Sequence, residues 1–579
     1  MADHNQRYAA LLKEIGSVAQ AGDLLRAGAL AEEALARGPG QPWLVNLVAF
    51  RCLESGEIER AVDLLTRARA QAPRDVFILN GLGVALKQQG RLPEAKEVFE
   101  VALRLDSRFA PAHYNMGTIL EEQGEIEAAR AAYEQAIGFE PNHAGALTAL
   151  STLAAQRGDY ETARVYGERA GGSKPGERSV AAGLAFLAWA RGEYGAARAM
   201  AEVALKQNPS DELARLMLAR AAFQAGQSGE AKERAQGLLD TGCADADIRA
   251  NAHALIADIA DRAGDTKSAF AHYETAKRES AREYAPKFAA TGLTRFVERA
   301  ERAAEYFSRA PAEAWRAGAG GDSAPAAPRQ HVFLMGFPRS GTTLLERCLA
   351  GHPAIVSMEE RDVLADLKGQ YFDPPDGFER FAALGREELD RYREDYWRAC
   401  RAAAGNLEDR IFIDKLPLNT VFMAGYAKLF PAAKILFALR DPRDVVFSCF
   451  HNQFAMSPAM FEFSTLEGSA RLYDAAMRIA AVCRTKLTLD LCEARYENLV
   501  RDFEGNLQSI CDFLGIEWHD KMRDFAARAR AAVPNTPSAV QLTRGLYDGS
   551  GQWRRYAEQM APALPILAPW VKRFGYPEI

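Results

Sequence analysis

Small residues recur through the first half of the chain at intervals of 34 residues. The glycines of this series are Gly22, Gly56, Gly90, Gly124, Gly158, Gly192 and Gly226. An alanine follows five residues after each of them, at Ala27, Ala61, Ala95, Ala129, Ala163, Ala197 and Ala231. Glycine frees the turn between two helices, and alanine lets the paired helices approach closely where a larger side chain would clash. The pattern predicts a repeated helix–turn–helix unit.

Proline closes most of these units, where it ends the second helix. The prolines are Pro39, Pro73, Pro141, Pro175 and Pro209, with Ser107 in the missing slot. An eighth unit, with Gly264 and Ala269, follows a four-residue insertion. A 34-residue helix pair of this kind resembles the tetratricopeptide repeat. The resemblance implies an all-α solenoid of about eight units over residues 1–283, followed by a capping helix and a linker over 284–329.

Stacked repeats of this type form a curved solenoid whose inner face binds an extended peptide or another protein. We therefore expect a protein or peptide partner at the array. The alternative is a scaffold that only dimerises the protein or stabilises its neighbour, so a homo-oligomer stays open. His113, His143, His253 and His272 lie in the array without ligand spacing, and we expect no metal site there.

From residue 331 the hydrophobic pattern changes to short apolar runs that alternate with helical stretches. The runs are HVFLMGF, AIVSM, IFID, KILFALR and LDLCEARY, in that order. Their order predicts an α/β domain over residues 330–579, with a parallel sheet and helices on both of its faces. Such sheets bind ligands where strands end and helices begin.

Composition narrows the class of protein. A chain of 579 residues is too long to fold around one hydrophobic core, so more than one domain is expected. Its composition, with 48% apolar residues, 26% charged residues and a net charge of −6, argues against disorder, collagen-like structure and nucleic-acid binding. The eight cysteines form no CxxC pair, which favours reduced thiols in a cytoplasm. No apolar run reaches the ~20 residues of a membrane span. We expect a cytoplasmic protein without a membrane span.

The most informative segment is GFPRSGTT at residues 336–343, which follows a predicted strand and opens a predicted helix. It has the frame of a nucleotide P-loop, with threonine in place of the lysine. Backbone amides and the helix amino terminus can still bind an anionic group. Without the lysine, kinase or ATPase chemistry is not expected. The predicted anion-binding residues are Pro338, Arg339, Ser340, Gly341, Thr342 and Thr343.

Two segments, GFPRSGTTLLERCLAGHP and LFALRDPRDVVFSCF, resemble the signatures of the sulfotransferase family. The resemblance covers roughly residues 331–560 and is nearest to tyrosylprotein sulfotransferases and related bacterial enzymes. It implies that the first segment holds the 5′-phosphosulfate of 3′-phosphoadenosine 5′-phosphosulfate (PAPS). It also implies that Arg440 and Ser448 contact the 3′-phosphate, for which a guanidinium is well shaped. Asn452 departs from the family, which has an arginine there.

The same resemblance assigns roles to further residues. It makes Glu360 the catalytic base, although a solvated Glu-Glu pair is the alternative and His352 is a rival base. It makes Lys415 a charge stabiliser, the alternative being a structural lysine. Tyr496 would lie near the nucleotide, unless it only packs. Ser538 and Arg544 would close over the donor, with Arg339, Lys415 and Ser538 supporting the transferred group.

The sequence thus predicts transfer of a sulfuryl group from PAPS to a hydroxyl without a metal. The favoured acceptor is a tyrosine of a protein or peptide held by the repeats. A carbohydrate, lipid or small-metabolite acceptor remains an alternative. A different alternative is a non-enzymatic repeat adaptor whose α/β domain senses a nucleotide.

Overall fold

The computed structural model describes residues 2–38, 41–123, 125–157, 159–170, 179–316, 328–531, 537–543 and 545–578. The chain has two compact units, Met1–Leu184 and Ala185–Ile579, which are described separately. The second unit contains the last repeats together with the α/β domain. The domain boundaries at 283 and 330, which follow the change in sequence pattern, stay predictions.

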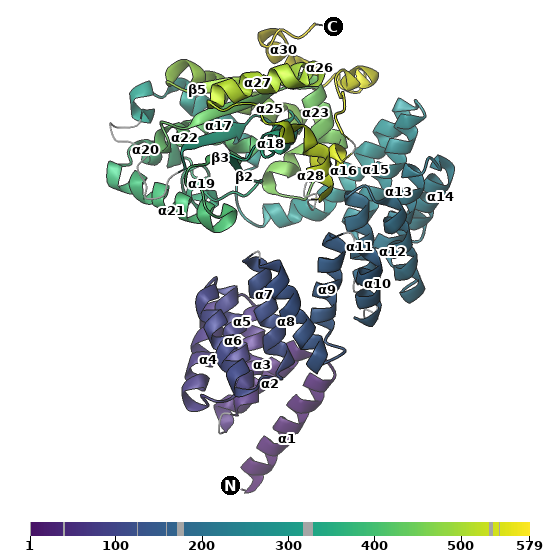
Figure 1. Ribbon diagram of the computed structural model, residues 1–579, viewed down its shortest axis with the longest axis vertical. Coiled ribbons are helices and arrows are strands. Elements are labelled where there is room, and N and C mark those ends of the chain that lie inside the picture. Colours follow the sequence, from purple (N-terminus) through teal and green to yellow (C-terminus); the bar gives the residue numbers. More distant parts are fainter. Residues whose placement is uncertain are drawn as a thin grey trace. The chain divides into compact units, whose positions relative to one another are not determined.

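The first unit consists of helix pairs (Figure 1). Its helices are α1 (Ala2–Gln20), α2 (Leu24–Arg37), α3 (Pro42–Glu54), α4 (Ile58–Gln71), α5 (Val76–Gln88), α6 (Leu92–Leu105), α7 (Ala110–Glu122), α8 (Ile126–Phe139), α9 (Ala144–Gln156), α10 (Tyr160–Arg169) and the start of α11 (Val180–Ala190). The second unit continues the pairs with α12 (Tyr194–Gln207), α13 (Glu212–Gln224), α14 (Ser228–Asp240), α15 (Ala246–Arg262) and α16 (Thr266–Ala289).

The repeat residues occupy the positions that their chemistry predicts. The described turn glycines have φ between 77° and 84°, in the left-handed region that favours glycine, at Gly22, Gly56, Gly90, Gly192, Gly226 and Gly264. The alanines of the repeat frame are completely buried: Ala27, Ala61, Ala95, Ala129, Ala163, Ala197, Ala231 and Ala269. The predicted solenoid of helix pairs is confirmed.

Replacing Ala95 by leucine should lower the free energy of unfolding by about 1–3 kcal/mol, because overpacking a filled interface forces neighbouring side chains and backbone to move. Ala95 is fully buried in α6, which packs against α5. Urea unfolding followed by circular dichroism measures the loss. The control Glu97→Leu, at an exposed position of the same helix, should cost much less. Equal losses would contradict the close-packing role of the alanine.

The rest of the second unit is the α/β domain. Its strands are β1 (Gln330–Met335), β2 (Ile355–Met358), β3 (Ile411–Lys415), β4 (Lys434–Leu439) and β5 (Asp490–Arg495). Its α-helices are α17 (Phe296–Arg309), α18 (Thr342–Leu349), α19 (Ala365–Tyr371), α20 (Gly377–Ala382), α21 (Arg386–Ala404), α22 (Met423–Leu429), α23 (Pro442–His451), α24 (Pro458–Phe461), α25 (Leu466–Lys486), α26 (Tyr496–Arg501), α27 (Phe503–Leu514), α28 (Phe525–Ala531), α29 (Pro537–Leu542) and α30 (Leu564–Arg573). Short 3-10 helices are η1 (Ala312–Trp315), η2 (Pro417–Phe422), η3 (Glu462–Ser464), η4 (Asp520–Asp524) and η5 (Gln552–Tyr556).

The strands form one parallel sheet in the order β2-β3-β1-β4-β5. Leu334 of β1 pairs with Lys415 of β3, and Met335 pairs with Phe437 of β4. Because all strands run the same way, their carboxyl ends meet at one edge of the sheet. The predicted parallel-sheet domain is confirmed, and β1 lies in its centre.

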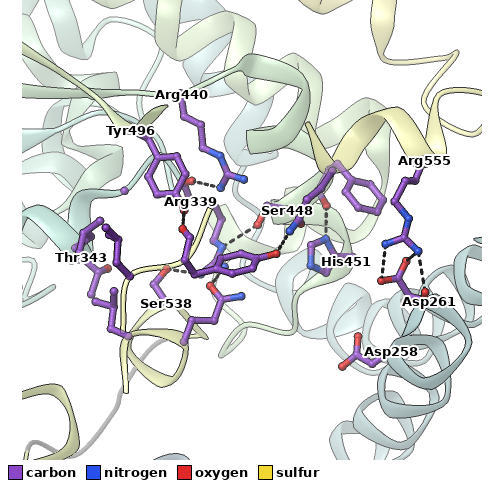
Figure 2. Close-up of a pocket in the computed structure, with 18 of the residues that line it drawn as sticks. Asp258, Asp261, Arg339, Thr343, Arg440, Ser448, His451, Tyr496, Ser538 and Arg555 are labelled. Carbon is purple, nitrogen blue, oxygen red and sulfur yellow. Dashed lines mark hydrogen bonds and ion pairs between the residues drawn. The ribbon is translucent and has the colours of Figure 1, made fainter. Parts of the chain in front are cut away.

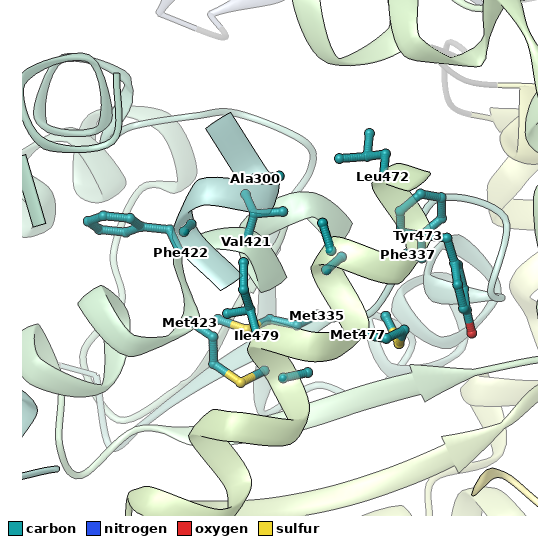
Figure 3. Close-up of a cluster of buried hydrophobic side chains, with 14 of the residues drawn as sticks. Ala300, Met335, Phe337, Val421, Phe422, Met423, Leu472, Tyr473, Met477 and Ile479 are labelled. Carbon is teal, nitrogen blue, oxygen red and sulfur yellow. The ribbon is translucent and has the colours of Figure 1, made fainter. Parts of the chain in front are cut away.

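Alternate residues of the strands face two separate hydrophobic cores. Val332 and Leu334 of β1 pack with α18 and α27 on one face. Phe333 and Met335 join a larger core on the other face, to which α17, α21 and α25 contribute. Figure 3 shows side chains of α17, β1, η2, α22 and α25 in this core. Although α17 lies in the segment predicted as a capping helix and linker, it packs against α25.

The last repeats contact the α/β domain directly within the second unit. Arg555 and Tyr556 of η5 both bind Asp261 of α15. Lys277 of α16 donates a hydrogen bond to the carbonyl of Asn452, 2.5 Å away. Among the described helices, none is long and apolar enough to cross a bilayer.

Candidate functional site

The loop between β1 and α18 lies at the centre of the sheet edge. Its first residue, Gly336, has a φ of 148°, and a Cβ there would approach the carbonyl oxygen of Ala438 to 2.6 Å. The amide of Gly336 donates to the Thr420 hydroxyl (3.1 Å), which in turn donates to the carbonyl of Gly336 (2.7 Å). Only glycine fits this close approach between the loop and β4.

The loop then presents backbone amides at the start of α18. The first amides of a helix have no partner within it, and the helix dipole adds partial positive charge there. Ser340, Thr342 and Thr343 are buried around this helix start, and the Pro338 carbonyl accepts a hydrogen bond from the Cys449 thiol. This geometry suits an anionic group.

Arg339 has a left-handed backbone (φ 72°), which is uncommon outside glycine. Its buried guanidinium donates to Ser448 Oγ at 3.0 Å, to Ser538 Oγ and to Gln541 Oε1 at 2.5 Å. Burial and the neighbouring Arg440 charge lower the pKa of Arg339 to about 10, so the side chain stays charged at neutral pH. The loop therefore carries a cation fixed by three side chains that come from α23 and α29.

Arg440 follows β4 and is also buried. It donates to the carbonyls of Arg339 (3.1 Å) and Gly549, and its guanidinium carbon lies 4.7 Å from the centre of the Tyr496 ring. Its buried Nε has no hydrogen-bond partner among the described residues. A buried donor of this kind is unfavourable unless it gains an acceptor. The Arg440 guanidinium thus adds a second buried cation to the site.

These side chains line one cavity of about 510 Å³ (Figure 2). The predicted site residues that line it are Arg339, Gly341, Thr343, Arg440, Ser448, Tyr496 and Ser538. The Tyr496 hydroxyl donates to the carbonyl of Tyr547 and accepts from the amide of Gly549, so the segment after α29 borders the same space. The predicted residue Arg544 lies outside the described residues.

Glu360 and Lys415 lie outside the lining of this cavity and pair with each other. Lys415 is 1% exposed, and its Nζ lies 2.9 Å from Glu360 Oε1 and 3.2 Å from Glu346 Oε2. Burial opposes its charge, but the two carboxylates outweigh burial and raise the pKa of Lys415. The Glu360 side chain is 28% exposed, so the pair has one accessible carboxylate.

The strand order explains this division. Glu360 follows β2 and Lys415 ends β3, on one side of the central loop. Arg440 follows β4 and Tyr496 follows β5, on the other side. The structure therefore gives the loop two flanks, a cationic cavity on one and a lysine–glutamate cluster on the other.

His352 and Asn452, which the sequence analysis considered, form hydrogen bonds with nearby residues of the chain. His352 accepts from the amide of Ala354 at Nδ1 and donates from Nε2 to the carbonyl of Glu517, as a residue of the turn after α18. Asn452 donates to the carbonyl of Ser448 (2.9 Å) and to His451 Nε2 (3.0 Å). Burial lowers the pKa of Lys277, which binds the Asn452 carbonyl, to about 7. The repeats thus supply a buried amine beside Asn452.

Sequence reasoning missed several residues of the site. Glu346 is a buried acid that accepts from Ser357 (2.6 Å) as well as pairing with Lys415, and Gln541 binds Arg339. The repeat residues that line the cavity are Phe223, Asp258, Asp261, Arg262 and Tyr273. Tyr273 belongs to the spacing of the eighth repeat, four residues after Ala269. The other four lie outside any recognisable motif, so only the packing of the repeats on the α/β domain places them at the cavity.

Among the described residues, no group of three or more histidine, cysteine, aspartate or glutamate side chains is arranged to hold a metal ion. The polar groups of the cavity are mainly hydrogen-bond donors and cations. The arrangement can bind an extended anion at the loop and Arg440, and can offer a carboxylate beside the loop.

Residues 331–520 match the model of a family described as the sulfotransferase family. Residues 53–108, 86–153 and 188–259 match models of the tetratricopeptide repeat. The chain therefore combines tetratricopeptide repeats with a sulfotransferase-family domain.

Three similar proteins each match part of the chain. An uncharacterized protein of Aquifex aeolicus is 24% identical over 262 residues, which are 43% of this chain and 34% of that protein. Protein-tyrosine sulfotransferase A of Caenorhabditis elegans is 28% identical over 256 residues, which are 42% of this chain and 67% of that protein. The chain thus spans about a third of the first relative and two thirds of the second. A sulfotransferase domain of a Synechococcus olefin synthase is 22% identical, with 45% of this chain and 100% of that domain covered and a TM-score of 0.32.

Proposed function

We propose that the chain transfers a sulfuryl group from PAPS to a hydroxyl, and that the favoured acceptor is a tyrosine of a protein or peptide. The observation that carries the proposal is one cavity that joins the amide-rich loop to Arg339, Arg440 and Ser448, in a domain that matches the sulfotransferase family. The donor would supply the activated sulfuryl group, and the protein would supply binding and proton transfer.

The residues of the cavity fit a nucleotide with two anionic ends. The amides at the start of α18 would bind the 5′-phosphosulfate, as anions bind at helix amino termini. Arg440 and Ser448 would hold the 3′-phosphate. The position of both residues in the cavity lining supports this assignment, because guanidinium–phosphate contacts are strong and directional.

Beside the loop, Glu360 would take the proton of the acceptor hydroxyl as its oxygen bonds to sulfur. The bond between sulfur and the 5′-phosphate oxygen would break, and 3′,5′-bisphosphoadenosine (PAP) would leave. Lys415 would hold the Glu360 carboxylate in position through their 2.9 Å ion pair and offset negative charge near the transferred group. Arg339 and Ser538, which are hydrogen-bonded to each other, would offset negative charge on the transferred group at the loop.

Two observations favour a protein or peptide acceptor over a carbohydrate, lipid or small metabolite. The repeats belong to a class of array that binds polypeptide, and the α/β domain is similar to a protein-tyrosine sulfotransferase. A polypeptide held by the array would thus be bound by the same chain that carries the sulfotransferase-family domain.

The test is transfer of ³⁵S from labelled PAPS. The full chain is incubated with labelled PAPS, with tyrosine-containing acidic peptides and with fractionated extract. We expect label on protein or peptide, and no label on peptides that carry phenylalanine in place of tyrosine. Label only on carbohydrate, lipid or metabolite fractions would contradict the proposed acceptor. ATP turnover with magnesium, without any transfer from PAPS, would contradict the whole proposal.

A further inference from the structure

The donor cavity has a second wall that comes from the repeats. Phe223 of α13, three residues near the end of α15 and Tyr273 of α16 line the same space as the loop and Arg440. Figure 2 shows Asp258 and Asp261 on the repeat helices, away from Arg440, Tyr496 and Thr343. The cavity therefore extends from the cationic loop to the last two repeats.

Asp258 is the polar group of this wall with an unused acceptor. The Tyr273 hydroxyl donates to its Oδ1 at 2.8 Å, and no described residue donates to its other oxygen. Its side chain is accessible from the cavity, although surrounding protein raises its pKa to about 6 by burial. A hydrogen-bond donor in the cavity would offset the cost of keeping this carboxylate there.

Arg262 lies beside Asp258 on the same wall. Its guanidinium carbon is 4.0 Å from the centre of the Phe223 ring, and its NH1 donates to the Phe223 carbonyl at 3.2 Å. These two contacts hold a flat cationic group over an aromatic ring. A planar guanidinium fixed in this way is a surface on which a planar ring can stack.

The two ends of the cavity select different parts of a ligand. Arg339 and Arg440 attract phosphate at one end. At the other end Arg555 is paired with Asp261, and the Asp258 carboxylate can accept a hydrogen bond from a neutral group. A nucleotide with its phosphates at the loop would thus place its base against the repeats. At its exocyclic position a 6-aminopurine offers a donor to a carboxylate, whereas a 6-oxopurine offers an acceptor there.

We propose that the last two repeats form the base-binding wall of the nucleotide site, where Asp258 accepts a hydrogen bond from the exocyclic amine of a 6-aminopurine and Arg262 stacks on the ring. This inference rests on the proposed function. It makes part of the repeat array a component of the donor site, in addition to any role in holding an acceptor.

Contacts around the wall keep it in place. Asp261, one turn after Asp258, binds both Arg555 and Tyr556 of η5. The amides of Gly551 and Trp553, at the start of the same segment, donate to Asp444 of α23 (2.6 and 3.0 Å). The segment therefore joins α15 to the helix that carries Ser448, and it fixes the base end of the cavity relative to the phosphate end.

Isothermal titration calorimetry with the full chain tests the inference. The ligands are PAP and its 6-oxo analogue, 3′,5′-bisphosphoinosine. We expect the unsubstituted chain to bind PAP about tenfold to a hundredfold more tightly than the analogue, as for a hydrogen bond to a charged group. Asp258→Asn should reduce this ratio to about threefold or less, because an amide can donate to the 6-oxo group.

Two further variants sharpen the test. Arg262→Ala should weaken both ligands by a similar factor and leave their ratio unchanged, since stacking does not read the exocyclic group. Asp240→Asn, at an exposed position of α14 outside the cavity lining, should leave both affinities unchanged. Melting temperatures show whether each variant is folded, and Arg262→Ala tests the wall if Asp258→Asn is not.

The failures of the two proposals are distinguishable. If the unsubstituted chain binds PAP and Asp258→Asn keeps the same ratio of affinities for PAP and 3′,5′-bisphosphoinosine, the base-binding wall is overturned and the proposed function stays in place. PAP affinity unchanged in Arg262→Ala would overturn the stacking role. No binding of either nucleotide by the unsubstituted chain would overturn the proposed function, and the inference with it.

Discussion

Glu360→Gln should lower sulfuryl transfer by about 10²- to 10⁴-fold, which is the usual contribution of a general base. The affinity for PAP should stay within about twofold of the original value. Glutamine has nearly the same shape as glutamate but cannot accept the proton of the acceptor hydroxyl. Glu360 lies outside the lining of the donor cavity, so its loss should not disturb the nucleotide. Single-turnover transfer of ³⁵S and calorimetric PAP titration measure the two effects separately.

The neighbouring Glu359 provides the matched control. Its carboxylate pairs with Arg347 rather than with Lys415, so Glu359→Gln changes the charge of the segment by the same amount without touching the lysine cluster. We expect transfer by this variant to stay within about threefold of the original rate, as for substitutions away from the reacting atoms. Equal losses in the two variants would assign the effect to the charge of the segment. Unchanged transfer by Glu360→Gln would remove Glu360 as the base.

Lys415→Met should lower the free energy of unfolding by about 3–5 kcal/mol, because removing one member of a buried ion pair leaves uncompensated buried charge. Here two carboxylates would remain, and Glu346 is 2% exposed. Transfer should fall as well, since Glu360 would lose the partner that holds it. Urea unfolding and the labelled-transfer assay, run at a temperature where the variant is folded, measure these losses.

A second substitution tests the cause of the instability. Glu346→Gln added to Lys415→Met removes the buried carboxylate and should recover part of the lost stability, without recovering transfer. No recovery would mean that packing, rather than unpaired charge, accounts for the loss.

The pH dependence of stability has a definite sign. The pKa of Lys415 is raised in the folded chain. The contribution of its ion pairs to the free energy of unfolding is therefore complete below the unfolded pKa of about 10.4, and it is lost as the pH rises through the folded pKa.

The repeats could be predicted because the same local requirement recurs in every unit. The turn at Gly56 needs a left-handed residue, and the helix pair at Ala61 needs a small one, so the sequence repeats with the structure. The strands were predictable for a related reason. A strand buried on both faces is largely apolar, as β1 is from Val332 to Met335.

The arrangement of the site was less predictable. The motifs place Glu360, Lys415 and Arg440 at or just after the ends of strands, but the strand order decides on which flank of the loop each one lies. Glu346 follows the loop in a helix whose charged residues would ordinarily face solvent, and only the fold shows that it faces Lys415. Asp258 occupies an ordinary repeat helix, and its place in the cavity depends on contacts between segments far apart in the chain.

The composite cavity limits where the array can change length. Its described lining residues all lie between Phe223 and Tyr556, within the second unit. Insertion or deletion of a whole 34-residue repeat among residues 1–184 would alter none of them, whereas loss of the repeat that carries Asp258 would remove part of the proposed nucleotide site. The amino-terminal repeats can therefore change in number without altering the cavity, while the last two repeats must keep the residues that line it.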